Sequence, residues 1–303
     1  YRILELGGNA IDAGVAAGIS LNVVLPSSTS FGGVAPILIY SAGQERVASI
    51  SGLGRWPRAA SREHFLEKRN GTIPAGAERV VVPAAADAWM MALIEHGTMS
   101  FEQVVPPALE YARDGIAVGA TLAKSMASFA EQAKQWPTRT EAFAEDGQFP
   151  ELGESLRQPA LARTFERLID VERSNISLGR ERAIQAARDF FYRDEIAEEI
   201  VSFVQDSGGF LSMSDMEDFS VGHEPPETGR FNEYEVYTNG PWGQGPACAE
   251  AVQLLASDDL ARLRHNTADY VHLVAESLKL SFSDRDAFYG DPDFVDIPMR
   301  GLL

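Results

Sequence analysis

The spacing of hydrophobic residues changes several times along the chain, and each change predicts a different element. Asn9 precedes the alanine-rich run AIDAGVAAGISLNVV, with Asp12 in its first turn. This pattern is typical of a capped helix whose small residues let another layer pack closely. The β-rich runs at residues 34–40 and 46–51 flank the turn residues 41–44 and predict a hairpin.

The middle of the chain has a helical pattern from about residue 84 to residue 208. Amphipathic runs lie at residues 104–113, 157–171 and 184–204. A strand is expected in FNEYEVYTN (residues 231–239), followed by helices at residues 249–255 and 267–287. One face of the last helix has apolar or small side chains, which predicts packing: Tyr270, Leu273, Val274, Ser277, Leu278 and Ser281.

This order of elements predicts an α+β fold, in which sheet and helices form layers. We treat residues 1–303 as a single domain with a mostly helical insert at about residues 84–208. The composition is close to globular averages, with 45% hydrophobic and 23% charged residues.

The charge, the single cysteine and the lack of long apolar stretches exclude several kinds of partner and site. The formal net charge is −18, so we predict no nucleic-acid partner, because a phosphate backbone would be repelled. Cys248 is the only cysteine, which rules out an intrachain disulfide and a cysteine-based zinc site. No uninterrupted apolar stretch reaches the length of about 18 residues expected of a membrane span. Localisation stays open between periplasmic or extracellular and cytoplasmic, since the leader region is not in this sequence.

Sequence motifs for common cofactors and metals are missing. There is no Walker loop, no G-x-S-x-G and no H-E-x-x-H, so we predict no cofactor. His265, His272 and Glu276 could gather a metal on one helical face, but such a pair of histidines more often lies on a helix surface. We therefore predict no metal site.

Two loops have an alternative interpretation as ligand sites. DPDFVD at residues 291–296 has carboxylate spacing that suggests calcium, but it lacks the glycine and the bidentate glutamate of a calcium loop, so a turn is expected. GPWGQGPAC at residues 240–248 could bring backbone amides and Trp242 close to a ligand, or could be a plain strand-to-helix turn.

Five segments, in order, resemble the large subunit of the gamma-glutamyltransferase family. They are LELGGNAIDAGVAAGISLNVVLPSSTSFGG, ERVVVPAAADAWMMALIEHGTMSFEQVVPPALEYARDGIAV, FYRDEIAEEIVSFVQDSGGFLSMSDMEDF, YEVYTNGPWGQGP and ADYVHLVAESLKLSFSDRDAFYGDPDFVDIPMRGLL. Members of this family are N-terminal nucleophile hydrolases. Their precursor cuts itself before a threonine, which becomes the nucleophile of the small subunit. The resemblance implies a four-layer αββα sandwich completed by a small subunit from the same precursor.

One loop departs from the family pattern. In gamma-glutamyltransferases a D-F-R-E-x-A-P motif supplies an arginine that binds the alpha-carboxylate of the gamma-glutamyl group. Here SGLGRWP follows the hairpin, which puts Ser51 and Gly52 in place of Asp-Phe and Leu53 in place of the arginine. Leucine cannot bind a carboxylate. We predict a substrate-binding wall of Ser51, Gly52, Leu53, Arg55 and Trp56, with no catalytic residue in this chain.

The resemblance thus predicts the large subunit of a self-processing threonine-nucleophile amidohydrolase or acyltransferase that cleaves a small amide. Its pocket is expected to differ from the gamma-glutamyl type. One alternative is a true gamma-glutamyltransferase or glutathione hydrolase that uses Arg55 or Arg58 instead. Another is a non-catalytic binding protein built on this fold. The expected partners are the small subunit and the amide substrate, with a dimer of heterodimers as a further possibility.

Overall fold

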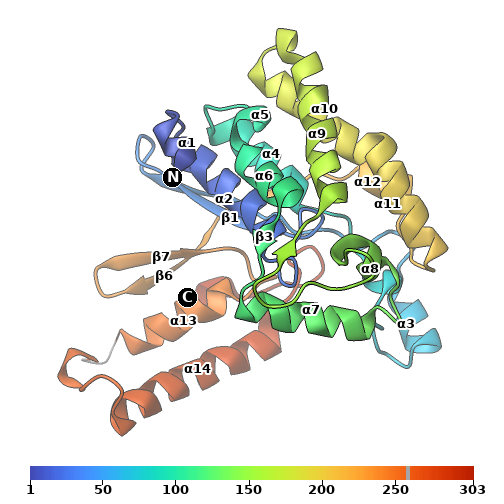
Figure 1. Cartoon of the computed structure of the whole chain (residues 1–303). Coiled ribbons are helices and arrows are strands. Elements are labelled where there is room, and N and C mark those ends of the chain that lie inside the picture. Colours follow the sequence, from blue (N-terminus) through green and yellow to red (C-terminus); the bar gives the residue numbers. More distant parts are fainter. Residues whose placement is uncertain (257–259) are drawn as a thin grey trace. The chain divides into compact units, whose positions relative to one another are not determined.

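The computed structural model describes residues 1–256 and 260–303 and divides the chain into two compact units. Unit 1 comprises residues 1–35 and 52–221, and unit 2 comprises residues 36–51 and 222–303. Each is described by itself (Figure 1).

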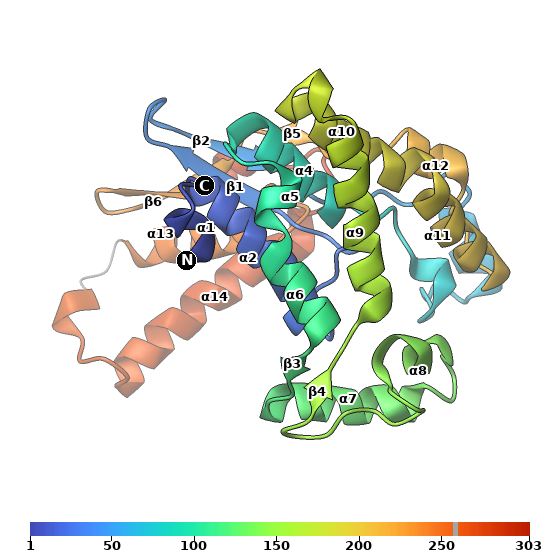
Figure 2. The ribbon, with the colours of Figure 1, turned by 45° about the horizontal axis from the view of Figure 1, so that its top comes forward.

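Unit 1 is almost entirely helical. Its helices are α1 (Arg2–Glu5), α2 (Ala10–Val24), α3 (Arg62–Lys68), η1 (Ala77–Arg79), α4 (Ala85–His96), α5 (Phe101–Val104), α6 (Pro106–Asp114), α7 (Ala120–Gln132), α8 (Thr138–Phe143), α9 (Pro159–Ser174), η2 (Ile176–Leu178), α10 (Arg180–Arg193), α11 (Glu195–Asp206) and α12 (Met213–Glu217). Its only strands among the described residues are β3 (Ile116–Ala117) and β4 (Ser155–Leu156), which pair antiparallel. Figure 2 shows α7 and α8 gathered beside this short pair.

Helix α2 begins as the sequence predicts. Asn9 accepts hydrogen bonds from the backbone N–H groups of Ile11 and Asp12, and Asp12 accepts one from the N–H of Asn9, which completes a capping box. The predicted close packing is also confirmed, because a Cβ atom at Gly18 would lie 2.4 Å from the ring of Trp89 on α4. The small residues of α2 therefore let α4 approach.

The core of unit 1 lies where α2, α4, α9 and α10 pack together. The ring of Phe31 contacts three other rings, among them those of Phe165 and Phe191 at 5.2 and 5.7 Å between centroids. A buried ion pair joins Asp87 of α4 to Arg188 of α10, and Asp87 also accepts a hydrogen bond from the N–H of Val221. These contacts hold Val221, the last residue of unit 1, against the core helices α4 and α10.

Unit 2 contains the strands of the two larger antiparallel pairings. Its elements are β1 (Ile37–Ser41), β2 (Arg46–Ile50), β5 (His223–Glu224), β6 (Glu227–Phe231), β7 (Tyr234–Thr238), α13 (Gly245–Leu255), η3 (Leu260–Arg262), α14 (Ala268–Phe288) and α15 (Met299–Leu302). The order β1-β2-β5 forms one sheet, and β6 and β7 form a separate hairpin. Helices α13 and α14 lie side by side in both views (Figures 1 and 2).

Several sequence predictions are confirmed with adjusted bounds. The hairpin forms with Ile37 opposite Ile50, so the first strand begins three residues later than expected. The run at residues 184–204 is two helices instead of one, because Asp194 adopts an extended conformation and caps α11. Strand β6 was not predicted. On α14, Ser277 and Ser281 are buried as expected, whereas Leu278 is 40% exposed.

Within residues 1–256 and 260–303, no helix combines the length and the apolar character needed to cross a bilayer.

Candidate functional site

The predicted substrate loop has a backbone that is fixed at several points. Ser51 belongs to unit 2, where its N–H donates to the carbonyl of Gly222 at 2.9 Å and its Oγ accepts from the N–H of Gly222 at 3.1 Å. Gly52 begins the part in unit 1. It is buried, has a φ of 53°, and its carbonyl accepts from the N–H of Ala35 at 2.9 Å. A positive φ favours glycine at this position.

The rest of the loop lies against residues 81–82. The carbonyl of Arg55 accepts a hydrogen bond from the N–H of Val82 at 2.9 Å. Gly54 approaches so closely that a Cβ atom there would lie 2.0 Å from the carbonyl oxygen of Val82. Because these contacts use the backbone, the side chains of Leu53, Arg55 and Trp56 are left exposed.

The two arginines of this region have different surroundings. Both the side chain and the backbone of Arg58 have partners. Its guanidinium pairs with Asp218 at 3.0 Å, and its backbone N–H donates to Asp215 at 3.1 Å. Burial by itself would raise the pKa of Asp215, but hydrogen bonds from Ser212 and Arg58 outweigh it and lower that pKa. For the exposed guanidinium of Arg55, the structure shows no hydrogen bond or ion pair to any described residue.

Trp56 is 43% exposed and packs with one edge against α3. Its ring meets the ring of Phe65 in a T-shaped contact at 5.6 Å between centroids. Phe65 is buried, and His64 beside it packs edge-on against Phe65 and Phe210 at 5.3 and 4.9 Å. Helix α3 therefore supports the inner side of the Trp56 ring.

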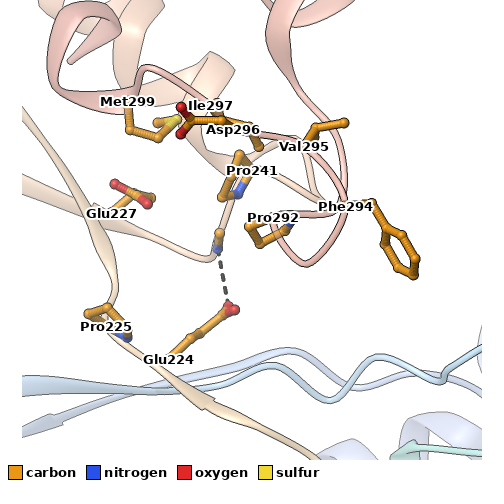
Figure 3. Close-up of a pocket in the computed structure, with 11 residues that line it drawn as sticks. Glu224, Pro225, Glu227, Pro241, Pro292, Phe294, Val295, Asp296, Ile297 and Met299 are labelled. Atoms are coloured by element: carbon orange, nitrogen blue, oxygen red, sulfur yellow. Dashed lines mark hydrogen bonds between the residues drawn. The ribbon is translucent and has the colours of Figure 1, made fainter.

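Unit 2 contains a hollow of about 650 Å³ beside the strand-to-helix turn at residues 239–244. Its apolar walls include Pro225, Pro241 and Met299, and three acidic side chains line it: Glu224, Glu227 and Asp296 (Figure 3). None of the five predicted wall residues lines this hollow.

The turn holds the carboxylate of Glu224. The N–H of Gly240 donates to it at 3.2 Å, and the indole N–H of Trp242 donates to it at 3.1 and 2.9 Å. Burial first, and then the charge of Glu224, raise the pKa of Glu227. GPWGQGPAC forms the predicted strand-to-helix turn that joins β7 to α13, and its Gly240 and Pro241 line the hollow.

A second acidic pair lies between α13 and α14 of unit 2, and sequence reasoning missed it. Glu250 is 4% exposed, and the hydroxyl of Tyr289 lies 3.4 Å from its Oε2. Burial, followed by the hydrogen bond and the charge of Asp284, raises the pKa of Glu250 to about 7. The sequence offers one sign of this pair, which is a single acidic residue among the small residues of ACAEAV. Such small residues are typical of a closely packed helix face.

Comparison with known proteins identifies the family. The model of the gamma-glutamyltranspeptidase family matches residues 1–303. The chain belongs to the gamma-glutamyltranspeptidase family. It is 30% identical over 302 residues to the glutathione hydrolase-like YwrD proenzyme of Bacillus subtilis, covering 100% of this chain and 55% of that protein.

Solved structures agree with this assignment. Cephalosporin acylase from Bacillus halodurans superposes with a TM-score of 0.86 at 28% identity, over 100% of this chain and 54% of that one. Gamma-glutamyltranspeptidase of Helicobacter pylori has a TM-score of 0.88 at 24% identity, over 99% of this chain and 83% of that one, and shows the fold alone. The fold class is therefore the α+β class of the N-terminal nucleophile hydrolases, as predicted. The chain spans about half the length of the curated relatives it matches.

Proposed function

We propose that this chain is the large-subunit part of a self-processing amidohydrolase or acyltransferase whose nucleophile is a threonine outside the chain. The match of the family model to residues 1–303 carries this proposal. The matched Bacillus subtilis relative is named a proenzyme and is nearly twice as long as this chain, which fits a precursor that is cut into two subunits.

The reaction that follows from this family membership is acyl transfer. The threonine hydroxyl attacks the amide carbonyl, with its own amine as the base, and an oxyanion hole stabilises the tetrahedral intermediate. Water or an amine then releases the acyl group from the acyl-enzyme. This chain contributes no catalytic group in the proposal. It supplies one wall of the acyl pocket and, with the small subunit, completes a four-layer αββα sandwich.

The acyl pocket is proposed to differ from the gamma-glutamyl type because of Leu53. Its side chain is 37% exposed on a loop whose backbone is held at Gly52 and Arg55. An isobutyl group offers no donor to a carboxylate, and losing such a contact costs on the order of 2–5 kcal/mol. The proposed wall is Leu53, Arg55 and Trp56, with Ser51 and Gly52 directly before them. The proposed substrate is a small amide with another acyl group.

A second candidate is a true gamma-glutamyltransferase or glutathione hydrolase that binds the carboxylate through Arg55. The lack of any described partner for this guanidinium favours Arg55 over Arg58, which is already paired with Asp218. Release of the aniline from a gamma-glutamyl anilide, with loss of that release in Arg55→Ala, would favour this candidate over an altered pocket.

The deciding experiment is a denaturing intact-mass spectrum of the purified full-length product, with N-terminal sequencing of any second polypeptide. We expect a second chain that begins with threonine. A single chain that stays uncut on incubation would instead support a non-catalytic binding protein on this fold. Size-exclusion chromatography with light scattering on the processed sample would then test the possible dimer of heterodimers.

A further inference from the structure

Helix α3 cannot hold its position by its own stability. It has only seven residues, and helices this short are marginal without outside contacts. Phe65, which supports Trp56, is nevertheless buried and lies between Trp56 and Phe210. Other contacts must therefore fix α3, and with it the ring of Trp56.

The carboxylate of Glu78 provides two of these contacts. Nε2 of His64, on α3, lies 3.1 Å from Oε2 of Glu78. Arg69, directly after α3, donates from Nε to both carboxylate oxygens at 3.0 Å and pairs with Glu78 through a second nitrogen. The side chain of Glu78 is only 16% exposed. The hydrogen bond from Arg69, with a further contribution from His64, lowers the pKa of Glu78 to about 2. The carboxylate is therefore charged at any working pH.

Glu78 itself lies on a firmly held turn. It is the middle residue of η1, which begins after Gly76, a residue with a φ of 116°. A Cβ atom at Gly76 would lie 2.3 Å from the ring of Trp136, and one at Gly209 would lie 2.6 Å from the carbonyl of Ala77. The turn is thus packed from two sides and gives the carboxylate a fixed base.

We propose that Glu78 is a positioning residue for Trp56. From its position on η1, Glu78 binds His64 and Arg69 and thereby fixes the position of α3. Phe65 of α3 then fixes the Trp56 ring through their T-shaped contact. The link to catalysis rests on the proposed function, in which Trp56 is part of the acyl pocket. Removing the carboxylate would leave His64 of α3 and Arg69 directly after it without their shared partner, and the helix could then shift.

The test compares Glu78→Ala and the milder Glu78→Gln in the full-length processed protein. Glu102→Gln is the matched control, because Glu102 also pairs with an arginine, Arg173, but on α5. Each variant is made with and without Trp56→Phe, so that the difference between the two emission spectra reports Trp56 alone among the four tryptophans. Activity is measured on acetyl, succinyl, glutaryl and gamma-glutamyl anilides.

We expect the Trp56 emission of Glu78→Ala to shift to longer wavelength and to be quenched more strongly by acrylamide. Glu78→Gln should show a smaller shift, since an amide can still accept a hydrogen bond, and Glu102→Gln should show none. KM for the best anilide should rise by about fivefold to tenfold with kcat little changed, as expected for a lost positioning contact worth about one decade in affinity.

Unchanged Trp56 emission in Glu78→Gln and in a folded Glu78→Ala would overturn the proposal. A clear emission shift with unchanged KM would support the positioning role of Glu78 and would instead refute the place of Trp56 in the acyl pocket. If Glu78→Ala does not fold, the smaller shift in Glu78→Gln decides the question.

Discussion

The buried carboxyl of Glu250, between α13 and α14, makes stability depend on pH in a direction opposite to that of most acids. Glu250 is 4% exposed, next to Asp284 and Tyr289. Since burial and the neighbouring carboxylate raise its pKa from 4.5 to about 7, the folded protein keeps a proton on Glu250 that the unfolded chain has already released. Between these two pH values the folded state binds more protons, so the free energy of unfolding falls as pH rises.

The size of the effect follows from the two pKa values. The difference between 4.5 and about 7 corresponds to a loss of about 3 kcal/mol in the free energy of unfolding. This loss is complete only at pH values above the higher pKa. In Glu250→Gln the amide has a similar shape, can still donate a hydrogen bond to Asp284, and has no proton to lose. The variant should therefore exceed the wild type by only about 1 kcal/mol at about pH 5 and by about 3 kcal/mol at about pH 8.

Urea denaturation at a series of pH values between about 5 and 8, followed by circular dichroism, measures this difference. Glu276→Gln on α14 is the control. Its carboxylate pairs with Lys279 at 2.8 Å on the surface, where solvent screens such a pair, and the hydrogen bond from Lys279 lowers its pKa, so it stays ionised over this whole pH range. An equal difference between wild type and Glu250→Gln at both ends of the pH range would refute the reasoning.

Three further predictions concern single side chains. Asp12→Asn should destabilise by about 2 kcal/mol in urea denaturation, because Asp12 accepts from the N–H groups of Thr98 and Met99 in a buried position. Burial would raise the pKa of Asp12, but these hydrogen bonds outweigh it and lower the pKa, so the wild-type advantage should vanish as pH falls through the folded-state value, below 3.8. Arg180→Met should lower the free energy of unfolding by about 2 kcal/mol. The guanidinium donates to the carbonyls of Leu93 and Ile94 in the last turn of α4 and to that of Met99 after it. A decrease below about 0.5 kcal/mol would contradict this role. Leu53→Arg should raise kcat/KM on a gamma-glutamyl anilide by about 30-fold if only the guanidinium is missing, and no gain would mean that the small-subunit side of the pocket differs as well.

The parts of the fold that could be predicted from the sequence are those with local causes. Asn9 caps α2 because its side chain reaches N–H groups two and three residues ahead, which a short stretch of sequence specifies. The hairpin of β1 and β2 follows from alternation and turn residues in the same way. Strand β6 has the sequence ETGRF, whose charges and glycine hide the β pattern. It forms because β7 pairs with it and Gly229 lies close to Ala249 of α13.

The contacts of the candidate loop could not be predicted from the sequence. Alignment of the loop with the family motif places Leu53, yet the contrast between a paired Arg58 and an unpartnered Arg55 depends on Asp218, 160 or so residues away in the chain. The same holds for Glu78 and for the pair of Glu250 and Asp284. Long-range contacts between charged side chains leave no periodic trace in a single sequence.

The loop at residues 51–56 is held mainly through its backbone, so its contacts tolerate a change of side chain at some positions. Its fixed points are backbone groups: the carbonyls of Gly52 and Arg55, and the close approach of Gly54 to Val82. Replacing the glycines would break these contacts, whereas a new side chain at position 53 or 55 would leave them intact. If the proposed function is correct, stability and specificity depend on different atoms of residues 51–56. Substitutions at Leu53 should therefore change substrate preference with little change in unfolding free energy, whereas Gly54→Ala should destabilise the protein.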